Sequence, residues 1–268
     1  MKEFSGVEPL MKAVALAEIL PRFNRLRPEE IFNKSENDYA TSADRKAEMA
    51  LGSGLKALLS GSVCLGEEAV HENPGIMAAL EEDAPVWIID PIDGTSNFIR
   101  GEADFSVMVA LVLNRETVGG WIFAPILGLM AEAVAGEGAR LNGNELKITP
   151  NENVIDRIVT THPAYRNAED ERMLAPLNRH QSVKLHARGA GLEYVDLARN
   201  LADAAVFTWQ NPWDHAAGLL LHREAGGHNA SLSGERFRLS GGNDLPIIAA
   251  RSHSAFNNLR QLLAIDHR

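Results

Sequence analysis

The segment from Trp87 to Thr95 carries the strongest chemical signal in the chain. Apolar residues lead into residues 90–95 (Asp-Pro-Ile-Asp-Gly-Thr), which place the carboxylates of Asp90 and Asp93 three positions apart. Proline fixes φ and removes a backbone donor, and glycine lets a ligand approach the chain closely. Carboxylates bind Mg²⁺, and free backbone N–H groups bind phosphate oxygens. The segment therefore predicts a site for a hard cation and an oxyanion, although a capped turn after a strand has a similar composition.

One class of phosphatase with a similar string is excluded by these residues. Phosphatases of the haloacid dehalogenase type carry Asp-x-Asp-Gly-Thr near the N-terminus, and the first aspartate is their nucleophile. In this chain the residue two positions before Asp93 is Pro91. A covalent aspartyl-phosphate mechanism would therefore lack its main residue.

Four further acids stand where they could join this site. Glu67 and Glu68 follow directly after a predicted strand, so they stand at its carboxyl end. Asp214 follows Trp213 ahead of a predicted helix, and Asp44 lies in a Thr-Ser-Ala-Asp string. Each has a common structural explanation when it is read alone: a solvated turn for the glutamates, an N-cap for Asp214 and a solvated first-turn acid for Asp44.

Helices and a mostly antiparallel sheet are expected in the first half of the chain. Apolar residues at helical spacing predict a helix over residues 9–26, and helix formers after Thr41 or Ser42 predict a capped helix as far as residue 59. Residues 35–39 are polar and are expected to form a loop. Strands are predicted over residues 62–65, 86–89, 105–113, 118–123 and 129–134. The pair Asn142-Gly143 predicts a two-residue hairpin turn.

The pattern after residue 150 is that of an α/β segment. Strands are predicted over residues 155–160 and 245–250, and helices over residues 169–178, 191–201, 216–225 and 255–265. The chain is therefore expected to be a layered α/β (α+β) protein with a seam near residue 150. Residues 1–268 are expected to form a single catalytic unit with approximate halves 1–150 and 151–268.

Composition restricts the class of partner and the compartment. The 26 Lys and Arg against 36 Asp and Glu give a net charge of −10, which argues against nucleic acid or an anionic membrane as the main partner. The single cysteine, Cys64, excludes an intrachain disulfide and a cysteine-rich zinc site. No signal segment or membrane-spanning apolar run is recognised, so a cytoplasmic protein is expected.

Read together, these strings resemble the motifs of the inositol monophosphatase family over nearly the whole chain. The Asp-Pro-[Ile/Leu]-Asp-Gly-Thr motif of that family is residues 90–95, and its Trp-Asp-x-Ala-Ala-Gly motif is residues 213–218. Its Gly-Glu-Glu and Thr-x-x-Asp motifs are residues 66–68 and 41–44. The resemblance implies a layered αβαβα sandwich of the inositol monophosphatase and fructose-1,6-bisphosphatase type. It also implies a Mg²⁺-dependent, lithium-sensitive phosphomonoesterase that forms a homodimer.

The resemblance also implies a role for each matching residue. The implied ligands of two or three Mg²⁺ ions are Glu67, Asp90, the backbone carbonyl of Ile92, Asp93 and Asp214. Asp44 and Thr95, with help from Glu67, are implied to position and deprotonate the attacking water. The residues implied to bind phosphate or substrate are Asp93, Gly94, Thr95, Ser96 and Asp214.

The sequence departs from the family where the substrate alcohol would bind. Many members carry a glutamate seven residues before the metal-binding Asp214, and this chain has Phe207 there. Phe207 cannot accept a hydrogen bond from a cyclitol, whereas Trp209 could stack on a flat substrate. Both aromatic residues could equally belong to the core or to a dimer interface. Glu193 is a candidate replacement acid, in a stretch where the usual Gly-Ser or Gly-Thr is altered to Gly-Ala-Gly at residues 189–191.

Three basic residues near these motifs have weaker roles. His215 is expected to point away from the side chain of Asp214, because adjacent helical residues lie about 100° apart around the helix axis. Arg179 and Arg188 are candidates for contacting a substrate phosphate or a partner, although exposed surface positions are favoured for both.

The sequence predicts a Mg²⁺-dependent phosphomonoesterase that hydrolyses inositol 1-phosphate or a related polyol phosphate through metal-activated water. One alternative is the same chemistry on 3′-phosphoadenosine 5′-phosphate, histidinol phosphate or fructose 1,6-bisphosphate. Another is an interaction or regulatory protein that retains the fold. The complete acidic set argues against a loss of catalysis but not against a second role.

Overall fold

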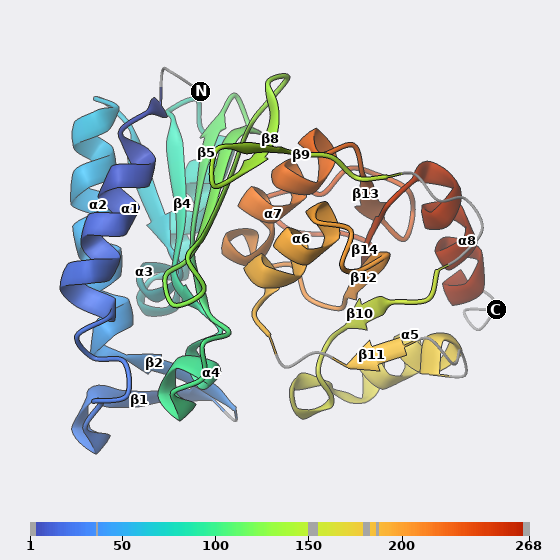
Figure 1. Cartoon of the computed structure of the whole chain (residues 1–268), viewed down its shortest axis with the longest axis horizontal. Coiled ribbons are helices and arrows are strands. Elements are labelled where there is room, and N and C mark those ends of the chain that lie inside the picture. The colour runs from blue at the N-terminus through green and yellow to red at the C-terminus, as the bar shows by residue number, and fades with distance from the viewer. Residues whose placement is uncertain (1–3, 36, 150–154, 179–182, 186–187, 265–268) are drawn as a thin grey trace.

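The chain folds into alternating layers of helix and sheet. The computed structural model describes residues 4–35, 37–149, 155–178, 183–185 and 188–264. From left to right in Figure 1, a helical layer is followed by a large sheet, a central pair of helices, a smaller sheet and an outer pair of helices. The expected αβαβα layering is confirmed.

Seven strands form the large sheet within the described residues, in the order β3-β4-β5-β6-β7-β8-β9. Its strands are β3 (Val63–Gly66), β4 (Val86–Asp93), β5 (Ser106–Leu113), β6 (Glu116–Ala124), β7 (Leu129–Val134), β8 (Gly138–Leu141) and β9 (Asn144–Leu146). Only β3 and β4 run parallel, so the sheet is mostly antiparallel as expected. The hairpin predicted at Asn142-Gly143 is present between β8 and β9, and both residues have positive φ.

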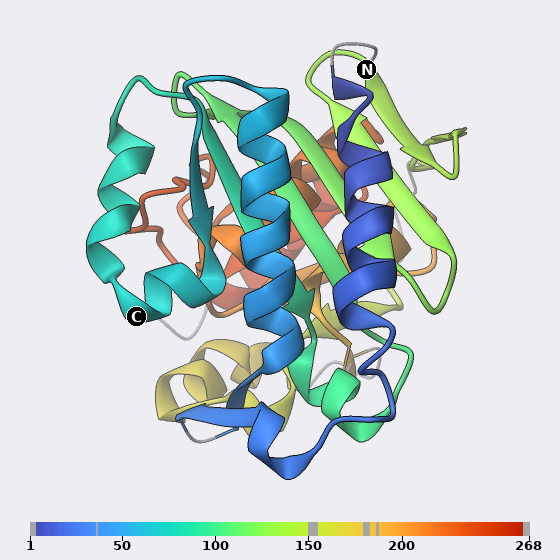
Figure 2. The same ribbon diagram turned by 90° about the vertical axis from the view of Figure 1, so that its left-hand side faces the viewer.

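Two helices cover one face of the large sheet, α1 (Val7–Val14) and α2 (Ser42–Leu58). Figure 2 shows them side by side across the strands. Their apolar faces meet those of Trp87, Val109 and Trp121 in one buried cluster. A helix was predicted over residues 9–26, but α1 begins two residues earlier, at Val7, and ends at Val14. It continues as a π-helical turn, Ala15–Ile19, after which the chain forms turns.

Helices α6 (Ala190–Ala198) and α7 (Pro212–Glu224) form the central layer between the two sheets. The predicted helix at residues 216–225 thus begins four residues early, because Asn211 stands at the N-cap and Pro212 opens the first turn. Glycine permits close packing here: a Cβ on Gly218 would lie 1.9 Å from the Tyr194 ring. The close contact of α6 and α7 therefore requires glycine at this position.

Five strands form the smaller sheet in the part of the chain that the structure describes, in the order β11-β10-β12-β14-β13. They are β10 (Ile158–Thr160), β11 (Val183–Leu185), β12 (Ala204–Phe207), β13 (His228–Ser231) and β14 (Ile247–Ala250). Helices α5 (Ala168–Asn178) and α8 (His253–Ala264) form the outer layer, and α8 packs on β13 and β14. Buried residues of this sheet, α5 and α8 form an apolar cluster of their own.

Several short elements were not predicted. A loop was expected at residues 35–39, but β1 (Ile31–Ser35) and β2 (Asp38–Thr41) pair as an antiparallel hairpin. The other short elements that were not predicted are the 3₁₀ segments Pro74–Glu81 and Pro163–Tyr165 with α3 (Glu67–Glu72) and α4 (Thr95–Arg100). A further 3₁₀ turn, Pro28–Glu30, precedes β1, where Pro28 and Glu29 predict a short turn. Among the described residues, none of the helices is long and apolar enough to cross a membrane.

Candidate active site

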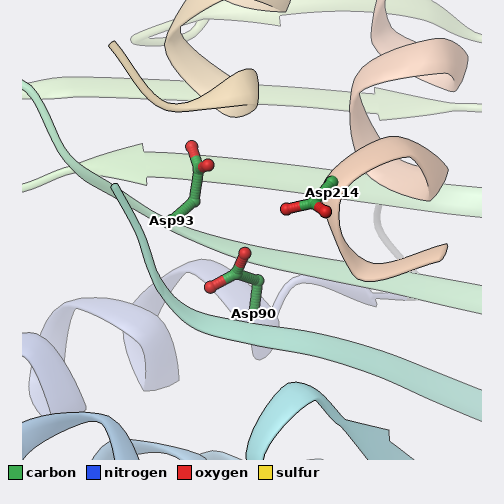
Figure 3. Close-up of side chains that lie close together, drawn as sticks. All are labelled: Asp90, Asp93 and Asp214. Carbon is green, nitrogen blue, oxygen red and sulfur yellow. The ribbon is translucent and has the colours of Figure 1, made fainter. Parts of the chain in front are cut away.

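Strand β4 delivers two aspartates to one place through a local irregularity. Side chains alternate between the faces of a regular strand, so residues three apart would point to opposite sides. The register between β4 and β5 shifts between Asp90 and Asp93, and Figure 3 shows both carboxylates turned toward the same space. The next residue, Gly94, has a φ of 90° before α4 begins, and a Cβ there would lie 3.0 Å from the carbonyl oxygen of Asp104.

Helix α7 delivers the third aspartate of this site. Asp214 lies in the first turn of α7, and its Oδ2 accepts hydrogen bonds from the indole Nε1 of Trp209 at 3.0 Å and the amide of Asn211 at 3.1 Å. The N-cap explanation for Asp214 is wrong, because Asn211 occupies that position. Two hydrogen bonds on one oxygen leave Oδ1 available to another ligand.

The three carboxylates form a compact cluster that suits a metal ion. Oxygen atoms of Asp90, Asp93 and Asp214 all lie within 4.8 Å of one another (Figure 3). Oδ1 of Asp90 is buried and has no hydrogen-bond partner among the described residues. Burial raises the pKa of Asp90 well above its usual range, and the charges of Glu67, Asp93 and Asp214 raise it further. An oxygen-rich, mutually repelling set of this kind fits a hard divalent cation.

The N-terminus of α6 holds Asp93 in place. Oδ1 accepts from Ala190 N at 2.9 Å, and Oδ2 accepts from Gly191 N at 2.8 Å and from Ser106 Oγ at 3.0 Å. A Cβ on Gly189 would lie 2.3 Å from Asp93 Oδ2. The Gly-Ala-Gly string at residues 189–191 therefore lets the helix backbone donate directly to Asp93.

Glu67 opens α3 and forms a buried ion pair that the sequence did not reveal. Lys34 Nζ, on β1, lies 2.8 Å from Glu67 Oε1 and 2.6 Å from Glu68 Oε1. Burial lowers the pKa of Lys34, but the two glutamates outweigh it and the net shift is upward. Glu48, on α2, accepts from the backbone N–H groups of Glu68 at 2.8 Å and Ala69 at 3.0 Å. The glutamates thus belong to a packed helix start, and the solvated-turn explanation is wrong.

Asp44 lies fully buried at the start of α2, so the solvated-acid explanation is wrong as well. Its Oδ2 accepts from the backbone N of Thr41 at 2.7 Å and from the Thr41 hydroxyl at 2.5 Å. Its Oδ1 lies 3.2 Å from the hydroxyl of Thr95, which is also 2.9 Å from the Ile92 carbonyl oxygen. Burial raises the pKa of Asp44 to about 7. A carboxyl group with such a pKa is suited to proton transfer near neutral pH.

A cavity of about 710 Å³ opens onto the cluster. Of the residues singled out from the sequence, it is lined by Glu67, Asp90, Ile92, Asp93, Gly94, Thr95, Ser96, Arg188, Glu193, Trp209 and Asp214. Glu193 is buried, its Oε2 has no partner among the described residues, and burial raises its pKa well above the usual range. Arg188 is half-buried and pairs with Asp104 and Asp196, so the surface position favoured for it is wrong. Arg179 lies outside the described residues.

The two aromatic residues in question have different positions. Phe207 is fully buried and packs against the ring of Tyr194, with centroids 5.1 Å apart, which is the core position left open by the sequence. Trp209 lines the cavity.

His215 Nε2 lies 2.9 Å from the Trp209 carbonyl oxygen, so it donates there, and Nδ1 accepts from the Tyr194 hydroxyl at 2.9 Å. Burial lowers the pKa of His215 to about 3.

Comparison with known proteins gives the class of this fold and site. The layered fold with its acidic cluster is that of metal-dependent phosphoric monoester hydrolases. The sequence matches the family model of the inositol monophosphatase family over residues 5–263, so the chain belongs to that family. Among solved structures, an inositol monophosphatase of Thermotoga maritima superposes with a TM-score of 0.82 at 24% identity, over 100% of this chain and 98% of that one.

Curated relatives of the chain carry different names. An inositol-1-monophosphatase of Rhizobium meliloti is 32% identical, over 87% of this chain and 86% of the relative. A fructose-1,6-bisphosphatase/inositol-1-monophosphatase of Thermotoga maritima is 31% identical, over 74% and 73% of the two chains. A Nus factor SuhB of Xylella fastidiosa is 32% identical, over 81% and 77%. Two of these names include inositol-1-monophosphatase, and the three together give more than one substrate and role to the relatives of this chain.

Proposed function

We propose that the protein is a Mg²⁺-dependent phosphomonoesterase that hydrolyses inositol 1-phosphate or a related polyol phosphate to the alcohol and inorganic phosphate. The observation that carries this proposal is the cluster of Asp90, Asp93 and Asp214, whose oxygens lie within 4.8 Å of one another at the cavity. Buried carboxylates at this separation repel one another strongly, so a cation is needed to hold them ionised together.

The residues proposed to hold two or three Mg²⁺ ions are Glu67, Asp90, the Ile92 carbonyl, Asp93 and Asp214. When bound, Mg²⁺ would lower the pKa of a coordinated water and neutralise charge on the phosphate and the leaving oxygen. All five residues line the same cavity. Asp214 comes from the half after residue 150 and the others from the half before it. Residues 1–268 are therefore proposed to act as a single catalytic unit.

Asp44 and Thr95 are the proposed residues that position and deprotonate the attacking water, with help from Glu67. Thr95 lines the cavity, and its hydroxyl lies 3.2 Å from the buried Oδ1 of Asp44. The water can donate a proton to Thr95 Oγ1 while the hydroxyl passes its own proton to Asp44. The raised pKa of Asp44, about 7, supports a proton acceptor that works near neutral pH.

The start of α4 is proposed to receive the phosphate group. Gly94, Thr95 and Ser96 line the cavity where this helix begins. The first N–H groups of a helix have no partner within the helix, so they are available to phosphate oxygens. Asp93 and Asp214 flank the same position and are proposed to contact substrate as well as metal.

The cavity wall supports a polyol as the leaving alcohol. Glu193 places a carboxyl group in this wall, where it can exchange hydrogen bonds with a hydroxyl group. Phe207 contributes no such group, because it lies in the core. Trp209 supplies a flat apolar surface on which a ring can lie.

A second candidate substrate is fructose 1,6-bisphosphate. Arg188 places a guanidinium group in the cavity wall, where a second phosphate could pair with it. The Thermotoga maritima relative at 31% identity has both activities in its name. The same site could take 3′-phosphoadenosine 5′-phosphate or histidinol phosphate, whose rings could lie on Trp209.

The test is phosphate release in the presence of Mg²⁺ from inositol 1-phosphate, glycerol 2-phosphate, fructose 1,6-bisphosphate, histidinol phosphate and 3′-phosphoadenosine 5′-phosphate. Asp90→Asn is expected to abolish release. Asp83→Asn, which changes an exposed acid outside the cavity, is the matched control and should retain it. Highest kcat/KM on inositol 1-phosphate supports the proposal, whereas highest kcat/KM on a bisphosphate or a ring-bearing ester assigns the site to that substrate.

Absence of release from every ester would favour an interaction protein that keeps the fold. The relative named as a Nus factor is the observation that keeps this role open. A homodimer is proposed from the family resemblance, and sedimentation analysis of the purified chain measures it directly.

A further inference from the structure

A second cavity, of about 590 Å³, shares no lining residue with the candidate active site. It lies against α7 between Ala216 and Arg223, the turn between β5 and β6, and the loop after β13. Four of its lining residues are arginines: Arg115, Arg223, Arg236 and Arg238. In a chain with a net charge of −10, this wall is a local concentration of positively charged side chains.

Two glutamates in the wall offset half of this positive charge. Arg115 lies 3.7 Å from Glu81, and Arg236 lies 3.8 Å from Glu116. The exposed fractions of the side chains are 59% for Arg115 and 56% for Glu81 in the first pair, and 76% for Arg236 and 64% for Glu116 in the second. Ion pairs as exposed as these contribute little to the free energy of folding.

The other two arginines of the wall have no acidic partner. Within the described part of the chain, neither Arg223 nor Arg238 forms an ion pair, and the guanidinium group of Arg238 donates to the carbonyl oxygen of Gly242. Arg223 is half-buried on α7, which orders its side chain more than a fully exposed position would. These two guanidinium groups are free to pair with an anion.

The rest of the wall suits a small organic molecule. Leu219, Leu220 and Phe237 give it an apolar floor, and Asn229 and Ser240 add hydrogen-bonding groups. Arginine binds phosphate and carboxylate groups in a bidentate way, and the volume is within the usual range for a small-molecule site. A long nucleic acid or anionic surface would meet the net negative charge of the rest of the protein.

We propose that this cavity binds a small organic polyanion that carries phosphate or carboxylate groups, with Arg223 and Arg238 as its main charge partners. This site is separate from the proposed catalytic site and does not depend on phosphatase activity. Its wall includes Phe237, whose ring centroid lies 5.3 Å from that of His215, the neighbour of Asp214 in the chain. Residues 216–223 of α7 also line this cavity, so an occupant would contact the helix that carries the proposed metal ligand Asp214.

The test is calorimetric titration of the full chain at low ionic strength, with pyrophosphate and citrate as the two probes, after divalent ions have been removed by passage over a chelating resin. Without divalent ions, the acidic cluster of the candidate active site repels both anions. We expect one site per chain. Arg223→Ala and Arg238→Ala are each expected to weaken binding at least about tenfold, because each removes a charge-assisted hydrogen-bonding group.

Two control variants locate the bound anion. Arg140→Ala changes an exposed arginine of β8 outside both cavities and should leave the affinity unchanged. Arg188→Ala removes a cation from the catalytic cavity and should also leave it unchanged. Melting temperatures check that each variant is folded, and Arg238, which is exposed in a loop, gives a test independent of the half-buried Arg223.

The two probes separate phosphate from carboxylate ligands, and binding of either at the two arginines supports the proposal. The proposal is overturned if neither anion binds. It is also overturned if Arg188→Ala abolishes binding while Arg223→Ala and Arg238→Ala do not, because the anion would then lie in the catalytic cavity.

Discussion

The indole Nε1 of Trp209 donates a hydrogen bond of 3.0 Å to Oδ2 of Asp214, which joins the cavity wall to a proposed metal ligand. The backbone of the same tryptophan is also fixed by a hydrogen bond, because His215 Nε2 donates to its carbonyl oxygen at 2.9 Å. The Tyr194 hydroxyl in turn donates to His215 Nδ1. Asp214 is thus oriented by a chain of hydrogen-bonded groups that runs from the cavity wall at Trp209 to the buried His215 and Tyr194.

Trp209→Phe is expected to weaken Mg²⁺ activation about 10- to 100-fold, because hydrogen-bond partners of metal ligands typically contribute that much to metal affinity. The phenyl ring keeps an aromatic surface but removes the N–H donor. The measurement is the Mg²⁺ concentration that gives half-maximal phosphate release. Trp213→Phe is the matched control, since that indole also lines the cavity but donates no hydrogen bond within the described structure. Equal effects of the two substitutions would show that the donor to Asp214 is unimportant.

The sequence predicted the parts of the site that lie close together in the chain. Residues 90–95 hold two carboxylates, a turn glycine and a hydroxyl group within one string, and the short Thr41-to-Asp44 string contains a capping box. A layered α/β fold followed from continuous apolar runs such as β5 and from the helical spacing of apolar residues in α2, whereas the αβαβα order of the layers was implied by the family resemblance.

What the sequence could not predict depends on contacts between distant residues. Lys34 meets Glu67 only because the β1–β2 hairpin lies beside α3, and the polar composition of this hairpin favoured a loop. The backbone of α6 reaches Asp93 from about one hundred residues away. Strand β12, with the sequence Ala-Ala-Val-Phe, is too short to show a period, so the core position of Phe207 was left open.

Asp44→Asn is expected to lower kcat by about 10²- to 10⁴-fold, because the variant keeps the shape of the side chain but cannot accept a proton. The Mg²⁺ concentration for half-maximal activity should change little, since Asp44 is not among the proposed ligands. Thr95→Ser keeps the hydroxyl 3.2 Å from Asp44 Oδ1 and should retain most activity, whereas Thr95→Ala should lose it. Wild-type turnover in Asp44→Asn would remove this residue from the mechanism.

Mg²⁺ is expected to raise the melting temperature of the wild-type chain relative to EDTA. A ligand present at about 100 times its Kd stabilises the folded state by about 2.7 kcal/mol. Asp90→Asn removes one of the clustered negative charges, so it should melt higher than wild type in EDTA by about 2 to 4 °C per kcal/mol of relieved repulsion. It should also lose most of the Mg²⁺ response. If Mg²⁺ raised the melting temperature of Asp90→Asn as much as that of wild type, the result would contradict a metal site at Asp90. The control is Asp83→Asn, which should respond to Mg²⁺ as wild type does.

His222 is expected to make the folded state less stable as the pH falls below about 6.5. Burial lowers the pKa of His222 to about 3, and its Nδ1 lies 3.1 Å from the Asn229 amide, which donates to it. The folded state therefore holds this imidazole neutral while the unfolded chain takes up a proton near pH 6.5, its ordinary pKa. The stabilisation is fully present above that pH. It decreases at up to about 1.4 kcal/mol per pH unit as the pH falls toward the folded pKa.

The measurement for His222 is urea unfolding of wild type and His222→Gln in EDTA, at pH values one unit below and one unit above the ordinary pKa. Wild type should lose about 1 kcal/mol more than the variant between the two pH values, because only wild type carries the His222 imidazole. His215, whose pKa burial also lowers to about 3, is common to both proteins. The acidic cluster acts in the opposite direction, since its raised pKa values favour the folded state as the pH falls, but it is common to both proteins. His71→Gln, at an exposed position, should match wild type. Parallel pH dependence of wild type and His222→Gln would show that the folded protein protonates His222 as readily as the unfolded chain does.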